Sequence, residues 1–143
     1  MKKLFFSVCA ASLLLFSACS KDDKDVSEMS STEISSMIVG TWQIIQDEWI
    51  DQIEGEEGSD VDKFAEGELT WTSNSDHSCI ERERDIESDK TDEYTGSWRI
   101  ENNTLIIFSE EWVIEKLTKD ELILCYEIDE EDEYWFERLY LKR

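Results

Sequence analysis

Residues 34–143 consist largely of short segments in which apolar and polar side chains alternate, separated by polar turns. Alternation with a period of two predicts strands that bury one face and expose the other. Before them, Ser31–Ile38 is expected to be a short helix, because Ser30 or Ser31 can cap it and its apolar residues share one face. The expected strands are residues 39–46, 68–73, 77–86, 94–100, 104–108, 111–117, 121–128 and 134–141.

Consecutive strands joined by hairpin-length turns favour an all-β fold. We expect an up-and-down antiparallel barrel of about eight strands with a short N-terminal helix, since closure leaves no exposed sheet edge. A two-sheet sandwich is the alternative. The acidic segment 47–67 interrupts the alternation, so we expect a lid or mobile loop there, with a short strand extension near Trp49 and a helical turn at 61–64.

Alternation also assigns one face of each strand to the barrel interior. Residues 77–86 carry charges on both faces, so this strand is expected to run beyond the core or to lie at an edge. The turn at 101–103 is expected to use the tolerance of Asn for positive φ. The predicted interior residues are Trp42, Ile44, Leu69, Trp71, Trp98, Ile100, Leu105, Ile107, Trp112, Ile114, Leu122, Leu124, Tyr126, Phe136 and Tyr140.

The N-terminus has the pattern of a secretory signal. Lys2 and Lys3 precede an apolar run, 4–16, that is too short to span a bilayer comfortably. Residues 16–19 read Phe-Ser-Ala-Cys and resemble a bacterial lipobox, in which small residues precede a lipidated cysteine. The resemblance implies that cleavage leaves Cys19 as the first residue and that acyl chains such as palmitate anchor it to a membrane. An ordinary signal peptide with a chance cysteine is the alternative.

The segment after Cys19 is polar, charged and poor in aromatic residues, as expected of a flexible tether. We therefore divide the chain into a signal peptide at 1–18, a tether at 19–31 and one folded domain at 32–143. The Lys/Asp-rich run past Cys19 also resembles the surface-export signal of Bacteroidota lipoproteins. It implies an outer-membrane anchor facing the cell surface, and without it the protein would face the periplasm.

The chain carries 36 acidic and 14 basic side chains, a net charge of −22. Nucleic acid requires basic surfaces, so this balance argues against a nucleic-acid partner. Solubility at a crowded cell surface is sufficient to explain the acidity. The acidic runs at 54–60 and 129–133 could offer oxygen ligands to calcium, but neither has the pattern of an EF-hand loop. No metal and no other cofactor is therefore expected.

Cys79 and Cys125 are the cysteines of the expected domain. An extracytoplasmic compartment permits a disulfide between them. They lie on the third and seventh expected strands, which face each other across a barrel and are too far apart for a bridge unless the barrel is flattened. Two half-buried thiols are favoured, with the bridge as the alternative.

Candidate catalytic residues are scarce. His77 is the single histidine, in a polar turn, and the sequence has no zinc-binding histidine cluster, serine nucleophile elbow or glycine-rich phosphate loop. Carboxylate pairs are abundant, but in so acidic a chain they carry little information. We therefore expect no enzymatic activity.

Three short motifs carry a family resemblance. Residues 39–42 have a Gly-x-Trp opening after a short helix, residues 96–107 join two expected strands through an Asn turn, and residues 117–124 precede a final Phe-Glu-Arg at 136–138. In this order they resemble the lipocalin-like domain of small Bacteroidota lipoproteins, over residues 34–143. The resemblance implies that Trp42 closes one end of the barrel and that Arg138 packs over its ring as a structural pair.

The open end of such a barrel can hold one small hydrophobic ligand. Aromatic residues either line that pocket or simply fill the core. A membrane-anchored binding protein is therefore the expected function, and a protein-interaction or accessory lipoprotein that uses its acidic face or the segment 47–67 is the alternative. The sequence selects no protein partner. The expected pocket residues are Trp71, Trp98, Trp112, Tyr126 and Phe136.

Overall fold

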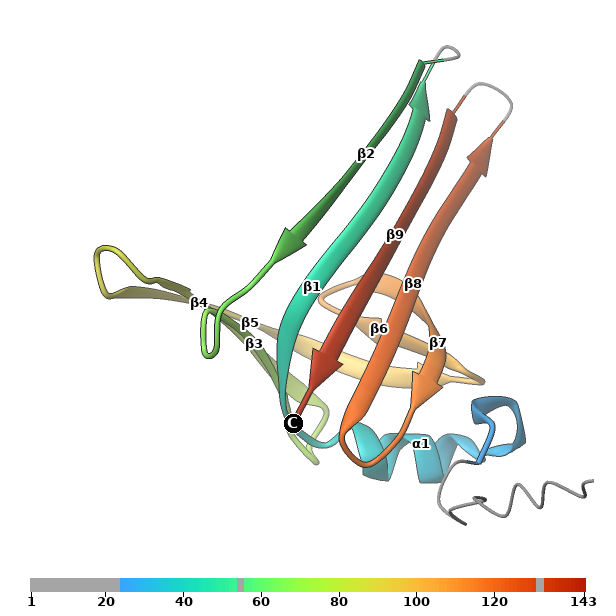
Figure 1. The fold of residues 1–143 in the computed structure, drawn as a ribbon. Coiled ribbons are helices and arrows are strands. Elements are labelled where there is room, and N and C mark those ends of the chain that lie inside the picture. The colour runs from blue at the N-terminus through green and yellow to red at the C-terminus, as the bar shows by residue number, and fades with distance from the viewer. Residues whose placement is uncertain (1–23, 54–55, 131–132) are drawn as a thin grey trace, which may run out of the picture.

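The computed structural model describes residues 24–53, 56–130 and 133–143. The expected signal peptide, Cys19 and the beginning of the tether lie outside the described residues. The described part forms a 3-10 helix, an α-helix and nine strands, arranged as Figure 1 shows. Their bounds are η1 (Val26–Glu28), α1 (Ser31–Ile38), β1 (Gly40–Ile53), β2 (Glu56–Lys63), β3 (Leu69–Ser73), β4 (Ser78–Asp85), β5 (Lys90–Glu101), β6 (Thr104–Ile107), β7 (Glu110–Leu117), β8 (Glu121–Glu130) and β9 (Glu133–Lys142).

The strands of the described residues form one antiparallel sheet that closes on itself. Strands β3 to β9 pair in chain order, and β1 joins the two ends of this series. It pairs with β3 through residues 40–43 and with β9 through residues 43–53. Strands β1 and β3–β9 therefore form a closed eight-stranded barrel, which confirms the predicted fold. The remaining strand, β2, pairs with β1 outside the barrel.

The expectation that residues 47–67 form a lid or mobile loop is wrong. Strand β1 continues to Ile53 and β2 returns along it, so the segment is mostly a long hairpin with Trp49 opposite Asp60. The strand extension near Trp49 is confirmed, but the described residues of this segment contain no helical turn. Seven of the eight β2 residues are exposed, so the segment has no apolar alternation to reveal it. Backbone pairing with β1, rather than burial, keeps it extended.

The barrel has two different ends. Figure 1 shows α1 lying across one end, while β1, β2, β8 and β9 extend together far beyond the other. The β4–β5 hairpin projects to a third side, and residues 82–85 at its tip are exposed. The charged strand expected at 77–86 therefore does run beyond the core. No helix in the described part of the chain is long and apolar enough to cross a membrane.

Helix α1 has the predicted bounds, and Ser30 is its N-cap. The Glu33 N–H donates to Ser30 Oγ at 3.2 Å, and the Ser30 N–H donates to the Glu33 carboxylate at 2.8 Å. This reciprocal capping satisfies two backbone donors at the start of the helix. Ile34 and Ile38 are fully buried and bring one face of the helix onto the barrel core.

Ordered structure begins earlier than the expected domain boundary. Helix η1 lies within the segment 24–31, and the side chain of Val26 is 6% exposed and part of the hydrophobic core. Strand β7 contacts η1 at the helical end of the barrel. Residues 24–31 therefore do not form the expected tether, because Val26 is buried and Met29 packs partly buried against the core.

Most predicted interior residues are confirmed. Ten of them are buried, and Leu69, Ile100 and Tyr126 pack partly buried against the same core. The ten buried residues are Trp42, Ile44, Trp71, Trp98, Leu105, Ile107, Trp112, Ile114, Leu122 and Leu124.

The assignment on β9 is wrong by one position. Leu139 and Leu141 are buried, opposite Leu124 and Leu122 on β8, whereas Phe136 and Tyr140 lie on the other face. The sequence offers apolar residues on both faces of this strand, so alternation alone does not decide. Pairing with the buried leucines of β8 fixes the register, and a shift of one residue reverses every side chain.

The two cysteines are free. Cys79 is 1% exposed and faces the interior opposite Gly96, whereas Cys125 pairs with Arg138 on the outer side of β8. They lie on opposite faces of the barrel wall, so the alternative of a disulfide is excluded and the preferred expectation of two thiols holds.

Candidate ligand site at the open end of the barrel

A tryptophan and an arginine close the helical end of the barrel. Trp42 is 1% exposed, and its indole N–H donates to the carbonyl of Ile38 at 2.9 Å. The guanidinium of Arg143 lies 4.1 Å from the centre of the Trp42 ring. Its Nη2 also donates to the carbonyls of Met37 and Val39, at the end of α1. This end therefore has a structural role.

The prediction that Arg138 packs over the ring of Trp42 is wrong. Arg138 belongs to the outward-facing set of β9, where it forms a bidentate ion pair with Glu115 and covers the ring of Phe136 at 4.8 Å. Arg143 continues the odd-numbered, inward-facing set of Leu139 and Leu141. The expected orientation of β9 is wrong by one residue, and this explains why Arg143, rather than Arg138, packs over the ring of Trp42.

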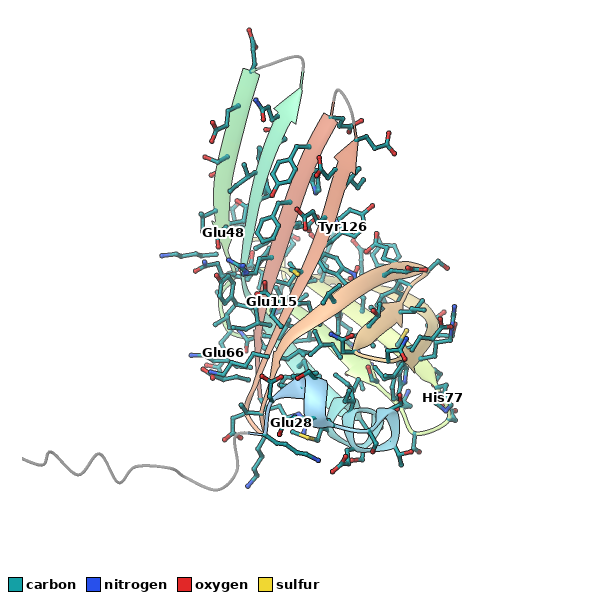
Figure 2. The ribbon with its side chains drawn as sticks, turned by 90° about the vertical axis from the view of Figure 1, so that its right-hand side faces the viewer. Glu28, Glu48, Glu66, His77, Glu115 and Tyr126 are labelled. Atoms are coloured by element: carbon teal, nitrogen blue, oxygen red, sulfur yellow. The ribbon has the colours of Figure 1, made fainter. Side chains whose placement is uncertain are left out.

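A hollow of about 500 Å³ lies at the other end of the barrel. It is bounded by the start of β7, the middle of β8 and the inner face of β9. Strand β7 begins here and ends against η1, so the hollow is at the end away from α1. Figure 2 shows Tyr126 well above Glu28 and the helices, on the extended part of the sheet. The lining residues are Ser109, Glu110, Glu111, Trp112, Tyr126 and Glu137.

A row of aromatic rings leads from the core to this hollow. Trp71 and Trp112 meet edge to face with ring centres 6.3 Å apart, and Trp112 and Tyr126 follow at 5.8 Å. Phe108 packs against Trp71 at 5.9 Å. Trp112 is 4% exposed and Tyr126 is partly exposed. The row therefore gives the hollow an apolar floor and one accessible aromatic wall.

Carboxylates occupy the rest of the wall. Burial raises the pKa of Glu137, the charge of Glu110 raises it further, and the N–H of Trp135, at 3.3 Å, opposes this rise. Asp47 lies on the neighbouring strand, and burial together with the charges of Glu137 and Asp62 raises its pKa to about 6. Asp47 shares the inner face of the sheet with Glu137 because the bulge between Ile44 and Gln46 turns it to the side of its pairing partner Leu139.

Two buried polar atoms at this end have no hydrogen-bond partner among the described residues. They are the indole nitrogen of Trp112 and the Oδ1 atom of Asp47. Buried donors and acceptors are normally paired, and leaving one unpaired costs about 1–3 kcal/mol. Both atoms have almost no solvent-accessible surface, so the two unmade hydrogen bonds lie inside the barrel wall rather than on the surface of the hollow.

The comparison with protein families agrees with this architecture. A family model described as a lipocalin-like domain matches residues 38–124. This chain belongs to the lipocalin-like domain family. No curated protein gives a significant match to it. The family match runs from the end of α1 to the middle of β8, so it includes Trp42 and Trp112 but ends before β9 and Glu137.

In this lipocalin-like barrel, the five expected pocket residues are not gathered in one place. Trp112 and Tyr126 line the hollow. Trp71 lies beneath them in the core, with its N–H donating to Glu81 at 2.6 Å. Trp98 is 3% exposed, and its N–H donates to the carbonyl of Asn74 at the β3–β4 turn, away from the hollow. These two tryptophans fill the barrel, as the alternative interpretation expected.

Phe136 was expected in the pocket but lies on the outer face of the barrel, beneath Arg138. The reversal on β9 explains this error too, and it places Glu137 in the hollow instead. The acidic lining of the lipocalin-like barrel was therefore not anticipated. The leucines at 139 and 141 are the signal that could have revealed it, because they share a face with Glu137.

His77, the single histidine, does not belong to this site. It lies in the β3–β4 turn with positive φ, and its ring centre is 5.1 Å from that of Trp98. Figure 2 shows it far from Tyr126. Within the described ranges of the lipocalin-like domain, no group of three or more His, Cys, Asp or Glu residues is placed to hold a metal ion. The chemistry available at the open end is therefore that of indole, phenol and carboxylate groups.

Proposed function

We propose that this protein binds a small, largely apolar molecule at the open end of its barrel and performs no catalysis. The hollow beside Trp112 and Tyr126 is the observation that carries the proposal. Its volume of about 500 Å³ falls within the usual range of small-molecule sites. Membership of the lipocalin-like family supports the same assignment.

The position of the hollow limits what can bind. Trp71, Trp98 and Trp112 are part of the hydrophobic core, so a ligand rests on the aromatic floor rather than entering the full depth of the barrel. The extended strands β8 and β9 stand beside it and supply a wall. A short acyl chain or one or two fused rings suit such a shallow site.

Native mass spectrometry of the purified protein tests this proposal by looking for a co-purified small molecule. Intrinsic tryptophan fluorescence then measures the affinity for octan-1-ol as a simple apolar probe. We expect Tyr126→Leu to change the affinity several-fold, whereas Tyr134→Leu, a matched change on the outer face of the same hairpin, leaves it unchanged. The absence of any co-purified molecule together with no octan-1-ol binding would contradict the proposal.

We also propose that Cys19 carries a lipid anchor that holds the barrel at the outer membrane, facing the cell surface. The lipobox-like residues 16–19 and the Lys/Asp-rich run after them support this proposal. Cys19→Ala is expected to abolish incorporation of labelled palmitate and to release the protein from the membrane fraction. Protease treatment of intact cells separates a surface location, where the barrel is cleaved, from a periplasmic one.

A second candidate is a protein-interaction role for the β1–β2 hairpin. Strand β2 is mostly exposed and carries acidic residues, and it extends outside the barrel. These features favour a basic partner that associates in a salt-sensitive way. Cross-linking in intact cells tests this role. Lysine substitutions at Glu57 and Asp60 are expected to abolish a specific cross-linked product, whereas the same change at Asp92 on β5 leaves it intact.

A further inference from the structure

Strand β2 has an unpaired edge. Among the strands that the structure describes, each of the others pairs with at least two neighbours, whereas β2 pairs with β1 alone. Figure 1 shows β2 at the outer side of the extended part of the sheet, next to β1. The free edge of a strand presents backbone N–H and C=O groups that can pair with another chain.

The odd-numbered residues of β2 direct their backbone groups toward this edge. The N–H of Phe64 donates to the carbonyl of Ile45, so the even-numbered positions are those that exchange hydrogen bonds with β1. The N–H of Val61 is turned the other way and donates to the carboxylate of Asp60 at 2.8 Å. The positions with outward N–H and C=O groups are Glu57, Ser59, Val61 and Lys63.

One face of the edge is acidic. Asp62 is opposite Asp47, on the inner face of the sheet, and Asp60 lies two positions before it on the same face. On β1, the carboxylate of Asp51 occupies the space where a side chain at Gly58 would stand, so it extends over β2 toward the edge. A strand added at this edge would therefore place every second side chain beside carboxylates.

The other face of the edge carries an exposed apolar group. Val61 is 45% exposed, and Ser59, two positions before it on the same face, is small and exposed. An added strand would place its remaining side chains beside these two residues. Neighbouring side chains on one face of a sheet interact in pairs, so apolar residues suit this side of the added strand.

A second copy of β2 is a poor occupant of the edge. Antiparallel pairing of two β2 strands through their odd-numbered residues would gather Asp60 and Asp62 of both copies on one face. Like charges placed opposite each other are destabilising, and the net charge of −22 adds a general repulsion between copies. Charge complementarity instead favours a basic segment from another protein.

We infer that the free edge of β2 accepts an extended segment of a partner protein as an additional antiparallel strand, in which lysine or arginine alternates with apolar residues. This inference rests on the second candidate function, the protein-interaction role of the β1–β2 hairpin, and names its partner's chemistry. Backbone hydrogen bonds supply the affinity, and the two faces of β2 select the side chains. The basic residues lie beside Asp51, Asp60 and Asp62, and the apolar residues lie beside Val61.

The register also determines which amides of the partner pair with β2. Residues directly opposite each other in an antiparallel pair share a face, so apolar residues of the added strand lie opposite Ser59 and Val61. These two positions direct their N–H and C=O groups outward. The N–H groups of the partner's apolar residues therefore point toward β2, and those of its basic residues point away.

Fluorescence anisotropy with labelled octapeptides tests the inference. The reference probe alternates lysine and valine. In one derivative the amides of the valines are N-methylated, and in another those of the lysines. We expect valine methylation to weaken binding at least about tenfold, because it removes the hydrogen bonds to β2, and lysine methylation to leave the affinity unchanged. A peptide that alternates glutamate and valine is expected not to bind.

Variants of the protein assign the effect to β2. Asp60→Asn keeps an acceptor for the N–H of Val61 but removes the charge, and we expect it to weaken binding of the lysine–valine peptide several-fold at low ionic strength. Asp129→Asn is the matched control, because Asp129 is exposed on β8, which β1 and β9 separate from β2. Ser59→Pro removes an N–H that faces outward, so it is expected to abolish peptide binding in a folded barrel.

The possible outcomes separate strand addition from the interaction role on which it rests. If both methylated peptides bind as tightly as the reference, or if Ser59→Pro binds it unchanged, strand addition is wrong while a basic partner held by charge remains. If no peptide binds, strand addition also fails, and cross-linking in intact cells tests the interaction role independently. A dimer in analytical ultracentrifugation that Ser59→Pro dissociates would make a second copy the occupant instead. Circular dichroism of each variant establishes that the barrel is folded.

Discussion

The guanidinium of Arg143 lies 4.1 Å from the ring centre of Trp42 and donates to the carbonyls of Met37 and Val39. The last residue of the chain thereby joins the end of β9 to the end of α1 and to the start of β1. Carbonyls at the end of a helix lack partners within the helix, so a cation placed there satisfies them. One side chain thus closes the helical end of the barrel.

This arrangement predicts that Arg143→Met destabilises the barrel while leaving the open end unchanged. The substitution keeps the apolar stem of the side chain but removes the cation over the indole and its two hydrogen bonds. We expect a loss of about 1–2 kcal/mol in the free energy of unfolding. Urea denaturation followed by tryptophan fluorescence measures it. Arg99→Met, which removes an ion pair with Glu101 whose two side chains are both exposed, is expected to cost less. Equal losses for the two variants would argue against a special role for Arg143.

The turn between β6 and β7 holds two residues in an unfavourable backbone conformation. Phe108 and Ser109 have φ angles of 53° and 74°, and Ile107 and Glu110 pair on either side of them. A two-residue hairpin turn with positive φ at both positions normally contains Asn or Gly. Ser109→Gly is therefore expected to stabilise the barrel by about 1 kcal/mol, because glycine adopts this conformation without a Cβ clash.

Thermal unfolding of Ser109→Gly measures that gain. Ser75→Gly is the matched control, since Ser75 is exposed in another turn and is not among the residues with positive φ. It is expected to leave the stability unchanged or slightly lower. Phe108 does not have to move in either variant, so its contact with Trp71 is preserved. A loss of stability in Ser109→Gly would show that the serine side chain contributes more than its backbone costs.

The elements that could be predicted from the sequence are those whose signal is local. Helix α1 is predicted from a capping serine, Ser30 or Ser31, and from its apolar face, and the structure has Ser30 as the cap in a reciprocal contact with Glu33. The turn at 101–103 was recognised by its asparagines, and Asn102 has the expected positive φ of 58°. Strands with one apolar face, such as β7 with Trp112, Ile114 and Leu117, were also recognised.

The errors have non-local causes. On β9, both faces carry large apolar residues, and only the pairing of Leu139 with Leu124 decides which face is buried. The errors at Phe136 and Arg138 both follow from that one choice, as does the failure to place Glu137 in the hollow. The β1–β2 hairpin has an exposed outer strand, so its structure comes from partner strands that local sequence does not identify. The candidate site combines β7, β8 and β9 and depends on this register.

The two thiols are expected to differ in reactivity. Cys79 is buried in the interior, and Cys125 is partly exposed on the outer side of β8. Burial, and then the charge of Glu115, raises the pKa of Cys125, so its thiolate is scarce at neutral pH. We expect iodoacetamide to modify Cys125 slowly and faster as pH rises, and to modify Cys79 only after unfolding. Peptide mass spectrometry distinguishes the two sites. A linked Cys79–Cys125 peptide would contradict the structure.

The stability of the barrel is expected to depend on the protonation of Asp47. Its pKa is raised to about 6 in the folded protein from an ordinary value of 3.8, so the folded state holds this proton more tightly than the unfolded chain. The contribution of Asp47 to stability is therefore present below pH 4 and is lost as pH rises through 6. The groups that face it are Glu137 from β9 and Asp62 from β2, and both are acidic.

Asp47→Asn removes the pH dependence that comes from Asp47. Comparing the variant with the unmodified protein therefore separates the effect of Asp47 from that of the other carboxylates. We expect the variant to be more stable by about 1 kcal/mol at pH 7.5, a figure reduced for solvent screening of a partly exposed group. The difference between the two proteins should shrink as pH falls from 7 to 4. Asp129→Asn, at an exposed site on β8, makes the same charge change outside this cluster and should give a smaller, flatter difference. The midpoints of urea unfolding, measured for the three proteins across this pH range, test these expected differences in stability. If Asp47→Asn is less stable than the unmodified protein at pH 7.5, the ionised carboxylate must have a partner that stabilises it, and the acidic repulsion at the open end is not what governs this group.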